Sequence, residues 1–352
     1  MHTIVPPYLL ARLAAAPAER FPKAVAAARS TLAVPRAYAP LPGHMDLSVE
    51  GDSLVVSARP DPDRLVSDAE QREELPGRDA RREGDAATGD AAVDEAYDGL
   101  GDVFAFFWDA FDRVSLDGRG GTLRATVHYG RDYDNAFWDG QRMVFGDGDG
   151  EVFTGFTRSL SVIGHELSHG VIETSGSLDY SGQSGALNES IADVFGALAE
   201  QHSRNQTADA ATWLIGAGIF TEAVSGVALR SLAAPGTAYD DDVLGRDPQP
   251  AHMRDYVETS GDNGGVHINS GIPNKAFHLV ATALGGHAWE RAGLIWYRAL
   301  TSGTLSPTAT FAEFAAATAE TAIQEYGEES EEAGAVRTAW SSVGVTGDVA
   351  FS

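Results

Sequence analysis

His165-Glu166-Leu167-Ser168-His169 is the stretch of this sequence that decides its fold and its chemistry. On a helix, residues four apart lie on one face, so both imidazoles can reach one metal ion. Neutral imidazoles suit zinc, which keeps three protein ligands and one open position when it is catalytic. Glu166 would lie beside that position and take a proton from water. The alternative is a chance match on a helix with two satisfied histidines, because short motifs carry false-positive risk.

Residues 185–196 predict a second helix that supplies the third ligand. Glu189 and Asp193 are four residues apart and share a face. We expect Glu189 to complete a site of two histidines and one carboxylate, and Asp193 to accept the far ring N–H of His165. Asn188 is assigned a similar supporting role. A solvated acidic face is the alternative, although the apolar neighbours argue against it because an unpaired buried carboxylate is costly.

Further blocks of the sequence resemble the thermolysin family of zinc metallopeptidases. Residues 135–138 (Asn-Ala-Phe-Trp) resemble its substrate-binding edge, residues 146–150 its acidic glycine turn, and residues 262–271 the segment with its catalytic histidine. These blocks occur in the family's order between about Asp94 and Val345. The resemblance implies an α+β fold, a thermolysin-like two-lobed metallopeptidase with a mixed β/α lobe, a mainly helical lobe and zinc in the cleft between them.

The resemblance also implies roles for individual residues. It makes His165, His169 and Glu189 the zinc ligands and Glu166 the general base. His267 and Tyr180 match the groups that hydrogen-bond the oxyanion, a role that needs donors placed where charge develops. The remaining matched positions are Asp262, which orients His267; Arg230, Asn135 and Ala136, which bind the substrate backbone; and Val162, Ile215 and Leu229, which line an apolar pocket after the scissile bond.

The first residues resemble the short propeptide of protealysin-like members of the family, which covers the active site. Pro6 and Pro7 restrict the chain to an extended form, and Tyr8 is expected to plug the cleft as the inhibitory segment. Leu9–Leu32 is expected to form one helix. Cleavage between about Pro40 and Glu70 would release the propeptide. The alternative is a frayed tail that contains two prolines.

Composition limits the partners of the chain. A formal net charge of -26 disfavours nucleic acids and anionic membrane surfaces. No apolar run is long enough to span a membrane. The resemblance implies other partners: peptide or protein substrates, the chain's own propeptide in the cleft, and a proteinaceous inhibitor. The absence of cysteine and of a secretory signal pattern predicts a cytoplasmic protein, or one exported without a conventional signal peptide.

Pattern shifts suggest three parts: 1–57, the propeptide and start of the connector; 58–202, the amino-terminal catalytic lobe with the zinc helices; and 203–352, a mainly helical carboxy-terminal lobe. Residues 59–92 are expected to be an exposed connector, preceded by a strand at Ser53–Ala58. Strands are predicted at Leu123–Val127 and Met143–Phe145. Helices are predicted at about Asp90–Phe111, Ile272–Leu284, Ala288–Ala299 and Thr310–Tyr326, and residues from about Thr207 onward are expected to be mainly helical.

Calcium is left open. Many relatives bind a pair of calcium ions beside the ligand helices, but here Ser161, Leu214 and Ala217 stand where those relatives have carboxylates. Glu200 and Asp209 remain, which is too few oxygen ligands for a tight paired site. Asp147 and Asp149 are candidates for calcium elsewhere, and a plain turn is the alternative for them.

Together these features predict a zinc endopeptidase that is made as a propeptide-inhibited precursor and cleaves before bulky apolar residues. The rival interpretation is a non-catalytic zinc protein that binds peptides or a protein partner. Glu166 and His267 argue against this rival, since a binding module does not need both.

Overall fold

The computed structural model describes residues 2–34, 60–176 and 178–345. Its six-stranded sheet has the order β1-β5-β6-β4-β2-β3. The strands are β1 His2–Thr3, β2 Arg64–Asp68, β3 Arg78–Arg82, β4 Leu123–Val127, β5 Ala136–Trp138 and β6 Met143–Phe145. β2 runs parallel to β4, and β4 parallel to β6, whereas β5 is antiparallel to both β6 and β1. The amino-terminal β1 therefore extends the sheet at the edge that β5 would otherwise leave open.

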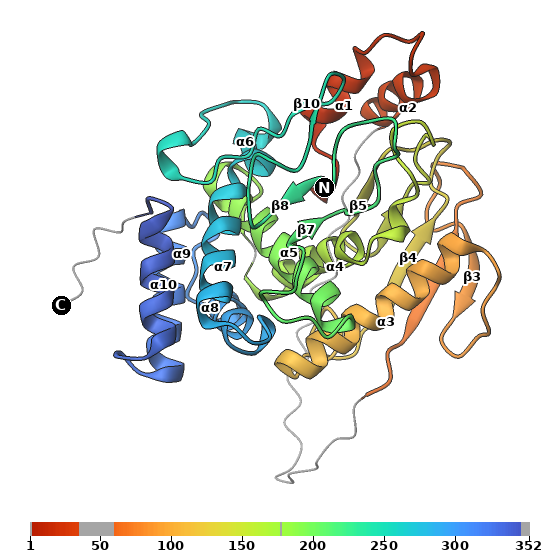
Figure 1. Cartoon of the computed structure of the whole chain (residues 1–352). Coiled ribbons are helices and arrows are strands. Elements are labelled where there is room, and N and C mark those ends of the chain that lie inside the picture. Colours follow the sequence, from red (N-terminus) through yellow and green to blue (C-terminus); the bar gives the residue numbers. More distant parts are fainter. Residues whose placement is uncertain (1, 35–59, 177, 346–352) are drawn as a thin grey trace.

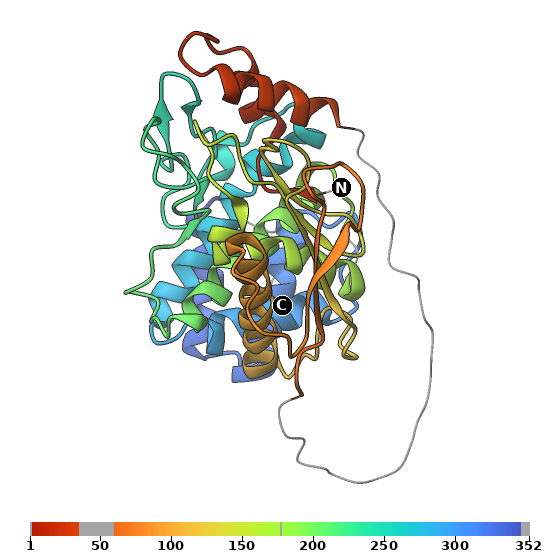
Figure 2. The ribbon, with the colours of Figure 1, turned by 90° about the vertical axis from the view of Figure 1, so that its right-hand side faces the viewer.

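Helices form most of the remaining regular structure (Figure 1). Three long helices lie beside the sheet and through the centre: α3 Ala91–Phe111, α4 Leu160–Ser175 and α5 Gly182–Ser203. The helical lobe follows and contains α6 Asp262–Asn269, α7 Gly271–Leu284, α8 Leu294–Thr301, α9 Phe311–Tyr326 and α10 Glu331–Ser342. α1 Pro7–Ala14 and α2 Pro22–Ala33 pack together on top of the molecule, as Figure 2 also shows.

The two central helices pack closely because glycines face each other where they meet. A Cβ atom on Gly164 of α4 would lie 2.9 Å from the Cα atom of Gly196 on α5. A Cβ atom on Gly196 would lie 2.5 Å from the carbonyl oxygen of Ser161. Any larger side chain at either position would force the backbones apart, and the side chains on the facing surfaces of α4 and α5 would separate with them.

Several predicted elements agree with the structure. β4 and β6 have the predicted bounds, and α3, α7 and α9 begin one residue later or earlier than predicted. The predicted helix at Ala288–Ala299 is a π-helical turn at Trp289–Gly293 followed by α8. The predicted strand at Ser53–Ala58 lies outside the described residues.

Other expectations were wrong. The single helix expected at Leu9–Leu32 is two helices, because Pro17 and Pro22 interrupt it and Pro22 starts α2. The expected connector at residues 59–92 contains β2 and β3; β2 is short and β3 is an arginine-rich edge strand, so neither shows a clear apolar alternation. Residues 207–261 are mainly turns and two-residue strand pairs rather than helix: β7 Leu214–Ile215 with β8 Arg230–Ser231, and β9 Asp240–Asp241 with β10 Gly245–Arg246.

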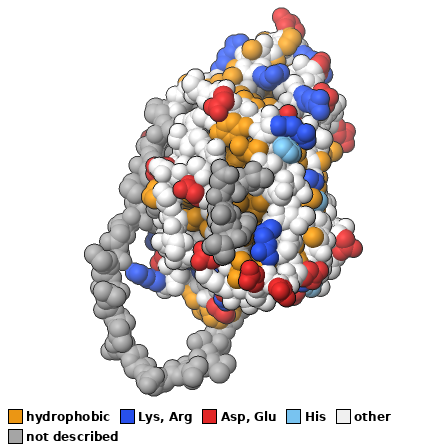
Figure 3. Space-filling model, turned by 90° about the vertical axis from the view of Figure 1, so that its left-hand side faces the viewer, with side chains coloured by type: hydrophobic (Ala, Val, Ile, Leu, Met, Phe, Trp, Pro, Cys, Tyr) orange, Lys and Arg blue, Asp and Glu red, His pale blue; other side chains and the backbone are white. Residues whose placement is uncertain are grey.

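Two features bear on binding to membranes or nucleic acids: the apolarity of the helices and the distribution of basic side chains on the surface. No helix in the described part of the chain is long and apolar enough to cross a membrane. On the face shown in Figure 3, basic and acidic side chains are scattered among neutral and apolar ones, and basic side chains form no continuous patch.

Candidate metal centre and catalytic cleft

Helices α4 and α5 bring the three predicted ligands together in the interior. His165 and His169 project from α4 and Glu189 from α5, and all three side chains are buried. The two imidazole Nε2 atoms are 3.0 Å apart. The carboxylate oxygens of Glu189 lie 3.6 Å from His165 Nε2 and 3.5 Å from His169 Nε2.

The far side of each imidazole is fixed by a hydrogen bond. Nδ1 of His165 lies 2.8 Å from Asp193 Oδ1, and Nδ1 of His169 lies 2.8 Å from Asn188 Oδ1. Both oxygens are acceptors, so each Nδ1 carries the proton and each Nε2 presents a lone pair. Asp193 and Asn188 thus lie where the sequence predicted, against the far ring nitrogens of the two histidines, and hold each ring in one orientation.

This donor set fits a zinc ion. Two lone pairs and a carboxylate that face one another at such distances repel unless a cation lies between them. Around a tetrahedral zinc ion with bonds of about 2.0–2.1 Å, neighbouring ligand atoms are about 3.4 Å apart, close to the separations seen here. In addition, Glu189 Oε2 is buried without a hydrogen-bond partner.

Asp193 also joins the metal ligands to Arg230. The guanidinium of Arg230 donates to both carboxylate oxygens of Asp193, over 2.8–3.1 Å, and Asn274 donates a further hydrogen bond over 2.9 Å. Burial alone would raise the pKa of Asp193, but the charge of Arg230 and the hydrogen bond with His165 outweigh it and hold the pKa below its usual range. Asp193 is therefore a carboxylate at neutral pH.

Glu166 lies next to the ligands with a side chain that has no partner. It is fully buried, and neither of its carboxylate oxygens has a hydrogen-bond partner in the described structure. Burial, and then the charge of Glu189, raise its pKa well above the usual range. A bound dication would favour the ionised form of this carboxylate. Glu166 is thus available to accept a proton from water.

His267 and Tyr180 approach the site from the helical lobe and from the loop before α5. Asn263, Gly264 and Gly265 have left-handed backbone conformations and turn the chain sharply within α6. The turn lets Asp262 Oδ1 accept from His267 Nδ1 over 2.6 Å. Burial would lower the pKa of His267, but Glu189 and Asp262 outweigh it and raise the pKa to about 9.

Tyr180 completes this side of the site. Its hydroxyl donates to Glu189 Oε1 and lies 3.3 Å from His267 Nε2. The structure therefore brings Tyr180, His267 and Asp262 together beside the proposed ligands, as the sequence predicted. Both donors lie beside Glu189, since the Tyr180 hydroxyl bonds its Oε1 and His267 Nε2 is 3.5 Å from its Oε2, and donors in this place would stabilise an anionic oxygen.

The amino-terminal segment runs through the cleft as an added strand. Ile4 N–H donates to the Ala136 carbonyl over 3.0 Å, and Arg230 donates to the Ile4 carbonyl over 2.9 Å. Val5 N–H donates to Asn135 Oδ1 over 2.9 Å, and Asn135 Nδ2 donates to the Val5 carbonyl over 3.1 Å. The residues predicted to bind a substrate backbone therefore bind this segment instead.

The carbonyl of Thr3 lies at the catalytic groups. Its oxygen is 2.8 Å from His267 Nε2. Because the other ring nitrogen of His267 bonds a carboxylate, both nitrogens act as donors and the ring is an imidazolium, in line with its raised pKa.

The segment expected to be inhibitory directly follows the residues that contact the catalytic groups. Residues 2–5 form the extended strand, whereas Pro6 is the N-cap of α1 and Pro7 its first residue. Proline suits that first helical position because the missing N–H would have no partner there. The two prolines thus end the extended segment and turn the chain into a helix, and Tyr8 in that helix lies close enough to Asp262 and Arg230 to interact electrostatically with both.

The side chain of Ile4 is fully buried in the main apolar core, which also contains the three residues of the predicted pocket, Val162, Ile215 and Leu229. These three side chains come from α4, from β7 and from the residue before β8. The antiparallel pairing of β7 with β8 brings the last two together, because Ile215 accepts the N–H of Leu229 over 2.9 Å.

The residues considered for calcium have other partners. Ser161 accepts the N–H of Gly216 over 3.1 Å, and Glu200 pairs with Arg204. Asp147 bonds His128, and Asp149 accepts the N–H groups of two residues in its own turn. The second carboxylate oxygen of Asp149, Oδ2, is buried without a hydrogen-bond partner.

Sequence reasoning missed His2. Its ring stacks on His169, with centroids 4.1 Å apart and an angle of 24° between the planes. Its potential ligand atom lies within 4.8 Å of those of His169 and Glu189. The only signal in the sequence is a histidine that precedes the apolar Ile4 by two residues, which places both on one face of a strand.

Comparisons with known proteins agree with this geometry. The family model described as "Thermolysin metallopeptidase, catalytic domain" matches residues 61–173, and that described as "Thermolysin metallopeptidase, alpha-helical domain" matches residues 176–345. An extracellular metalloprotease of Pectobacterium carotovorum is 52% identical over 304 residues, which cover 83% of this chain and 87% of the relative. An extracellular minor metalloprotease of Serratia marcescens is 49% identical over 57% of each chain.

A solved structure is also similar over nearly the whole chain. It is described as the precursor of protealysin, a metalloproteinase from Serratia proteamaculans. It superposes with a TM-score of 0.87 at 49% sequence identity and covers 98% of this chain and 100% of its own.

The predicted location was wrong. The sequence was expected to be cytoplasmic or exported without a conventional signal peptide, whereas two of these relatives are described as extracellular. The absence of cysteine misled the prediction, because a protein that folds around a large apolar core and a metal site needs no disulfide in either environment.

Proposed function

This chain belongs to the thermolysin family of metallopeptidases and is a metalloendopeptidase, and we propose that it is a precursor whose own amino terminus blocks a zinc site formed by His165, His169 and Glu189. Family membership implies zinc. The observation that carries the proposal is that Asn135, Ala136, Arg230 and His267 all form hydrogen bonds with the backbone of residues 3–5. We further propose that, like the two relatives, it acts outside the cell.

The proposed chemistry is hydrolysis of a peptide bond by water. When bound, zinc lowers the pKa of water and polarises the substrate carbonyl. Glu166 takes the proton of the attacking water and passes it to the leaving amine. His267 and Tyr180 donate hydrogen bonds to the oxygen that becomes negative, and Asp262 holds the ring of His267 in place. Arg230 and Asn135 hold the peptide after the scissile bond.

The proposed specificity is for a bulky apolar residue directly after the scissile bond. Ile4 follows the Thr3 carbonyl, which bonds His267, and its side chain is fully buried in the apolar core that also contains Val162, Ile215 and Leu229. A substrate bound in the same register would place its own apolar side chain there. Burial of a large apolar side chain contributes about 1.5–3 kcal/mol. Such residues should therefore be favoured over charged ones at this position.

Casein hydrolysis and metal analysis test the proposal together. The trimmed enzyme should hydrolyse casein, lose activity in a zinc chelator and regain it with zinc. His169→Ala should lose most of the bound zinc, because one of three ligands is gone. His252, a half-buried histidine that precedes the short 3-10 turn at Met253–Asp255, provides a matched control as His252→Ala. Full zinc occupancy and normal activity in His169→Ala would disprove the ligand assignment.

Peptide substrates test the specificity separately. A pair of peptides that differ only in leucine or glutamate after the scissile bond should be cleaved at rates that differ by at least about 10-fold, equivalent to about 1.4 kcal/mol. Equal rates would refute the proposed pocket but leave the zinc site untouched.

A further inference from the structure

We propose that His2 is a fourth protein ligand of the zinc ion while the amino-terminal segment is docked, and that it thereby closes the position from which water would attack. The inference rests on the proposed function, because it requires zinc at His165, His169 and Glu189. In the precursor, catalysis would then be prevented in two ways: the segment occupies the cleft, and His2 coordinates the zinc ion.

The ring of His2 lies against the proposed ligands. It stacks on His169, with centroids 4.1 Å apart, and meets Tyr180 edge to face, with centroids 4.2 Å apart. The ligand atoms of His2, His169 and Glu189 are within 4.8 Å of one another. Neighbouring ligand atoms around tetrahedral zinc are about 3.4 Å apart, so this spacing is compatible with one ion shared by the three residues.

His2 has a nitrogen atom that needs a partner. Its Nδ1 is buried and has no hydrogen-bond partner among the described residues. The oxygen Oε2 of Glu189 and both carboxylate oxygens of Glu166 are also buried without a hydrogen-bond partner. A buried imidazole nitrogen without a partner is unfavourable. A cation shared by His2 and Glu189 would satisfy both residues.

The backbone on either side holds His2 in this place. β1 pairs His2 with Trp138 and Thr3 with Phe137 on β5. Successive side chains of a strand point to opposite faces, so His2 and Ile4 share a face. Since Ile4 is fully buried in the cleft, the strand directs His2 toward the interior as well. The ring therefore reaches the ligands without distortion of the segment.

Coordination by His2 explains how a substrate-like segment remains intact. The carbonyl of Thr3 bonds His267, and Ile4 has the contacts expected for the residue after a scissile bond. A catalytic zinc site needs one position open for water, whereas a site with four protein ligands is closed. With His2 in that position, Glu166 has no water to activate, although the peptide lies in the register for cleavage.

X-ray absorption at the zinc edge counts the imidazole ligands directly. The experiment uses the full-length Glu166→Gln chain, which should not process itself, with zinc bound. The expected result is three imidazoles in this parent and two in Glu166→Gln/His2→Phe. Phenylalanine keeps an aromatic ring to stack on His169 but cannot bind a metal. Two imidazoles in the parent would overturn the proposal.

The rate of zinc release to a chelator provides a second readout. The loss of a ligand should increase the release rate at least about 10-fold, the lower end of the effects seen when metal sites lose a supporting residue. His2→Phe and His2→Ala should both show the increase. If only His2→Ala does, stacking rather than coordination protects the metal and the proposal is wrong. Thr3→Val, which keeps the backbone contacts of β1, should release zinc at the parent rate.

Failure of this inference can be distinguished from failure of the proposed function. If the parent binds zinc through only two imidazoles and loses it in His169→Ala, the proposed zinc site stands and the role of His2 falls. If the parent binds no zinc, or if His169→Ala binds it normally, the proposed function itself fails.

Discussion

Glu166 is the side chain on which turnover should depend most directly. Its carboxylate is buried beside the proposed ligands and has no protein partner. Glu166→Gln preserves the shape of the side chain but removes the site that accepts the proton. We expect activity on casein to fall by at least about 10²–10⁴-fold, with the zinc content unchanged. Activity within a few-fold of the parent, with zinc bound, would show that another group is the base.

Asp193 should matter for stability as well as for metal binding. It accepts hydrogen bonds from Arg230, Asn274 and His165 in the buried interior. Asp193→Asn leaves the charge of Arg230 buried without its counter-ion, which should lower the free energy of unfolding by about 3–5 kcal/mol. Chemical denaturation measures this loss. The exposed Asp117→Asn serves as the control, and equal stability of the two variants would contradict the buried ion pair.

The sequence was sufficient to predict the residues whose spacing is fixed by a helix. His165 and His169, and likewise Glu189 and Asp193, lie four apart, and the helical repeat brings each pair to one face. His2 could not be found in this way, since its position depends on a strand pairing with residues more than 130 positions away. The prediction relied on Pro6 and Pro7, because two prolines favour an extended chain. Proline is equally suited to the start of a helix, which is where both residues lie.

At the scale of elements, His128 links the start of α3 to the glycine-rich turn. Its Nδ1 lies 2.9 Å from Asp147, and its Nε2 lies 3.2 Å from Asp90, the N-cap of α3. The hydrogen bond with Asp147 is the main cause that raises the pKa of His128, to about 9. A protonated ring can donate to both carboxylates at once.

This contact should stabilise the fold in a pH-dependent way. Because the pKa of His128 is higher in the folded than in the unfolded chain, its contribution is complete below the unfolded value of about 6.5 and is lost as the pH rises through about 9. His128→Gln should therefore lower the melting temperature near pH 6 and have little effect near pH 10. A difference from the parent that stays constant over this range would contradict the assignment.

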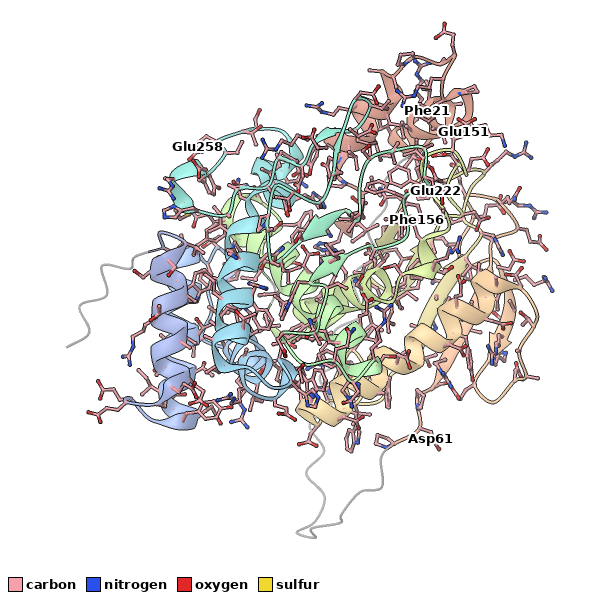
Figure 4. The ribbon with its side chains drawn as sticks, viewed as in Figure 1. Phe21, Asp61, Glu151, Phe156, Glu222 and Glu258 are labelled. Carbon is pink, nitrogen blue, oxygen red and sulfur yellow. The ribbon has the colours of Figure 1, made fainter. Side chains whose placement is uncertain are left out.

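Glu151 should help to hold the propeptide in place because it binds the first turn of α2. Its Oε2 accepts the backbone N–H groups of Lys23 and Ala24 over 2.9 and 3.0 Å. Figure 4 shows Glu151 near Phe21, the N-cap residue of α2, and Glu222 in the same region. The side chain of Glu151 thus caps a helix from another part of the chain, a contact typically worth about 0.5–2 kcal/mol.

Glu151→Ala should loosen the docked propeptide. In the Glu166→Gln background, limited proteolysis should remove α1 and α2 about 2–30-fold faster, the range that corresponds to the loss of one cap. Glu222→Ala is the matched control because it removes a nearby carboxylate for which the described structure shows no hydrogen bond to α2. If both variants are digested at the parent rate, the cap does not contribute to docking.

Elements with strong local signals were predicted, and those that depend on distant partners were not. β4 and β6 are short apolar runs, and α3 is a long amphipathic helix with a capping Asp90, so local sequence defines them. β3 is charged and becomes a strand only because β2 offers it an edge. The two-residue pair β7 and β8 is likewise defined by tertiary contacts, although it positions Arg230 and Ile215.

At the scale of the whole molecule, the amino terminus acts as an extra strand on a sheet built by the rest of the chain. β1 lies at the edge of the six-stranded sheet, while α1 and α2 lie outside the two lobes (Figures 1 and 2). A tethered segment has a high effective concentration, so modest contacts are enough to keep it bound. Release should therefore require a cut between α2 and the catalytic lobes.

The position of β2 restricts where this cut can fall. β2 pairs with β4 on one side and with β3 on the other, within the sheet. Cleavage at Arg64–Glu70, part of the range expected from the sequence, would damage the sheet. We therefore expect the cut after Ala33 and before Arg64, and sequencing of the new amino terminus identifies it. A mature form that begins at Leu65 or later would contradict this limit.

The strength of docking should in turn control the rate of maturation. Ile4 is the fully buried anchor of the segment in the cleft, and replacement of a buried isoleucine by alanine typically removes about 2–5 kcal/mol. Ile4→Ala should therefore be trimmed at least about 10-fold faster than the parent, as followed by intact mass over time. Ala11→Ser, on the exposed face of α1, should mature at the parent rate. In the Glu166→Gln background all three chains should stay full-length, and circular dichroism should confirm that Ile4→Ala has folded. If the folded Ile4→Ala chain matures no faster than the parent, release of the segment from the cleft does not limit maturation.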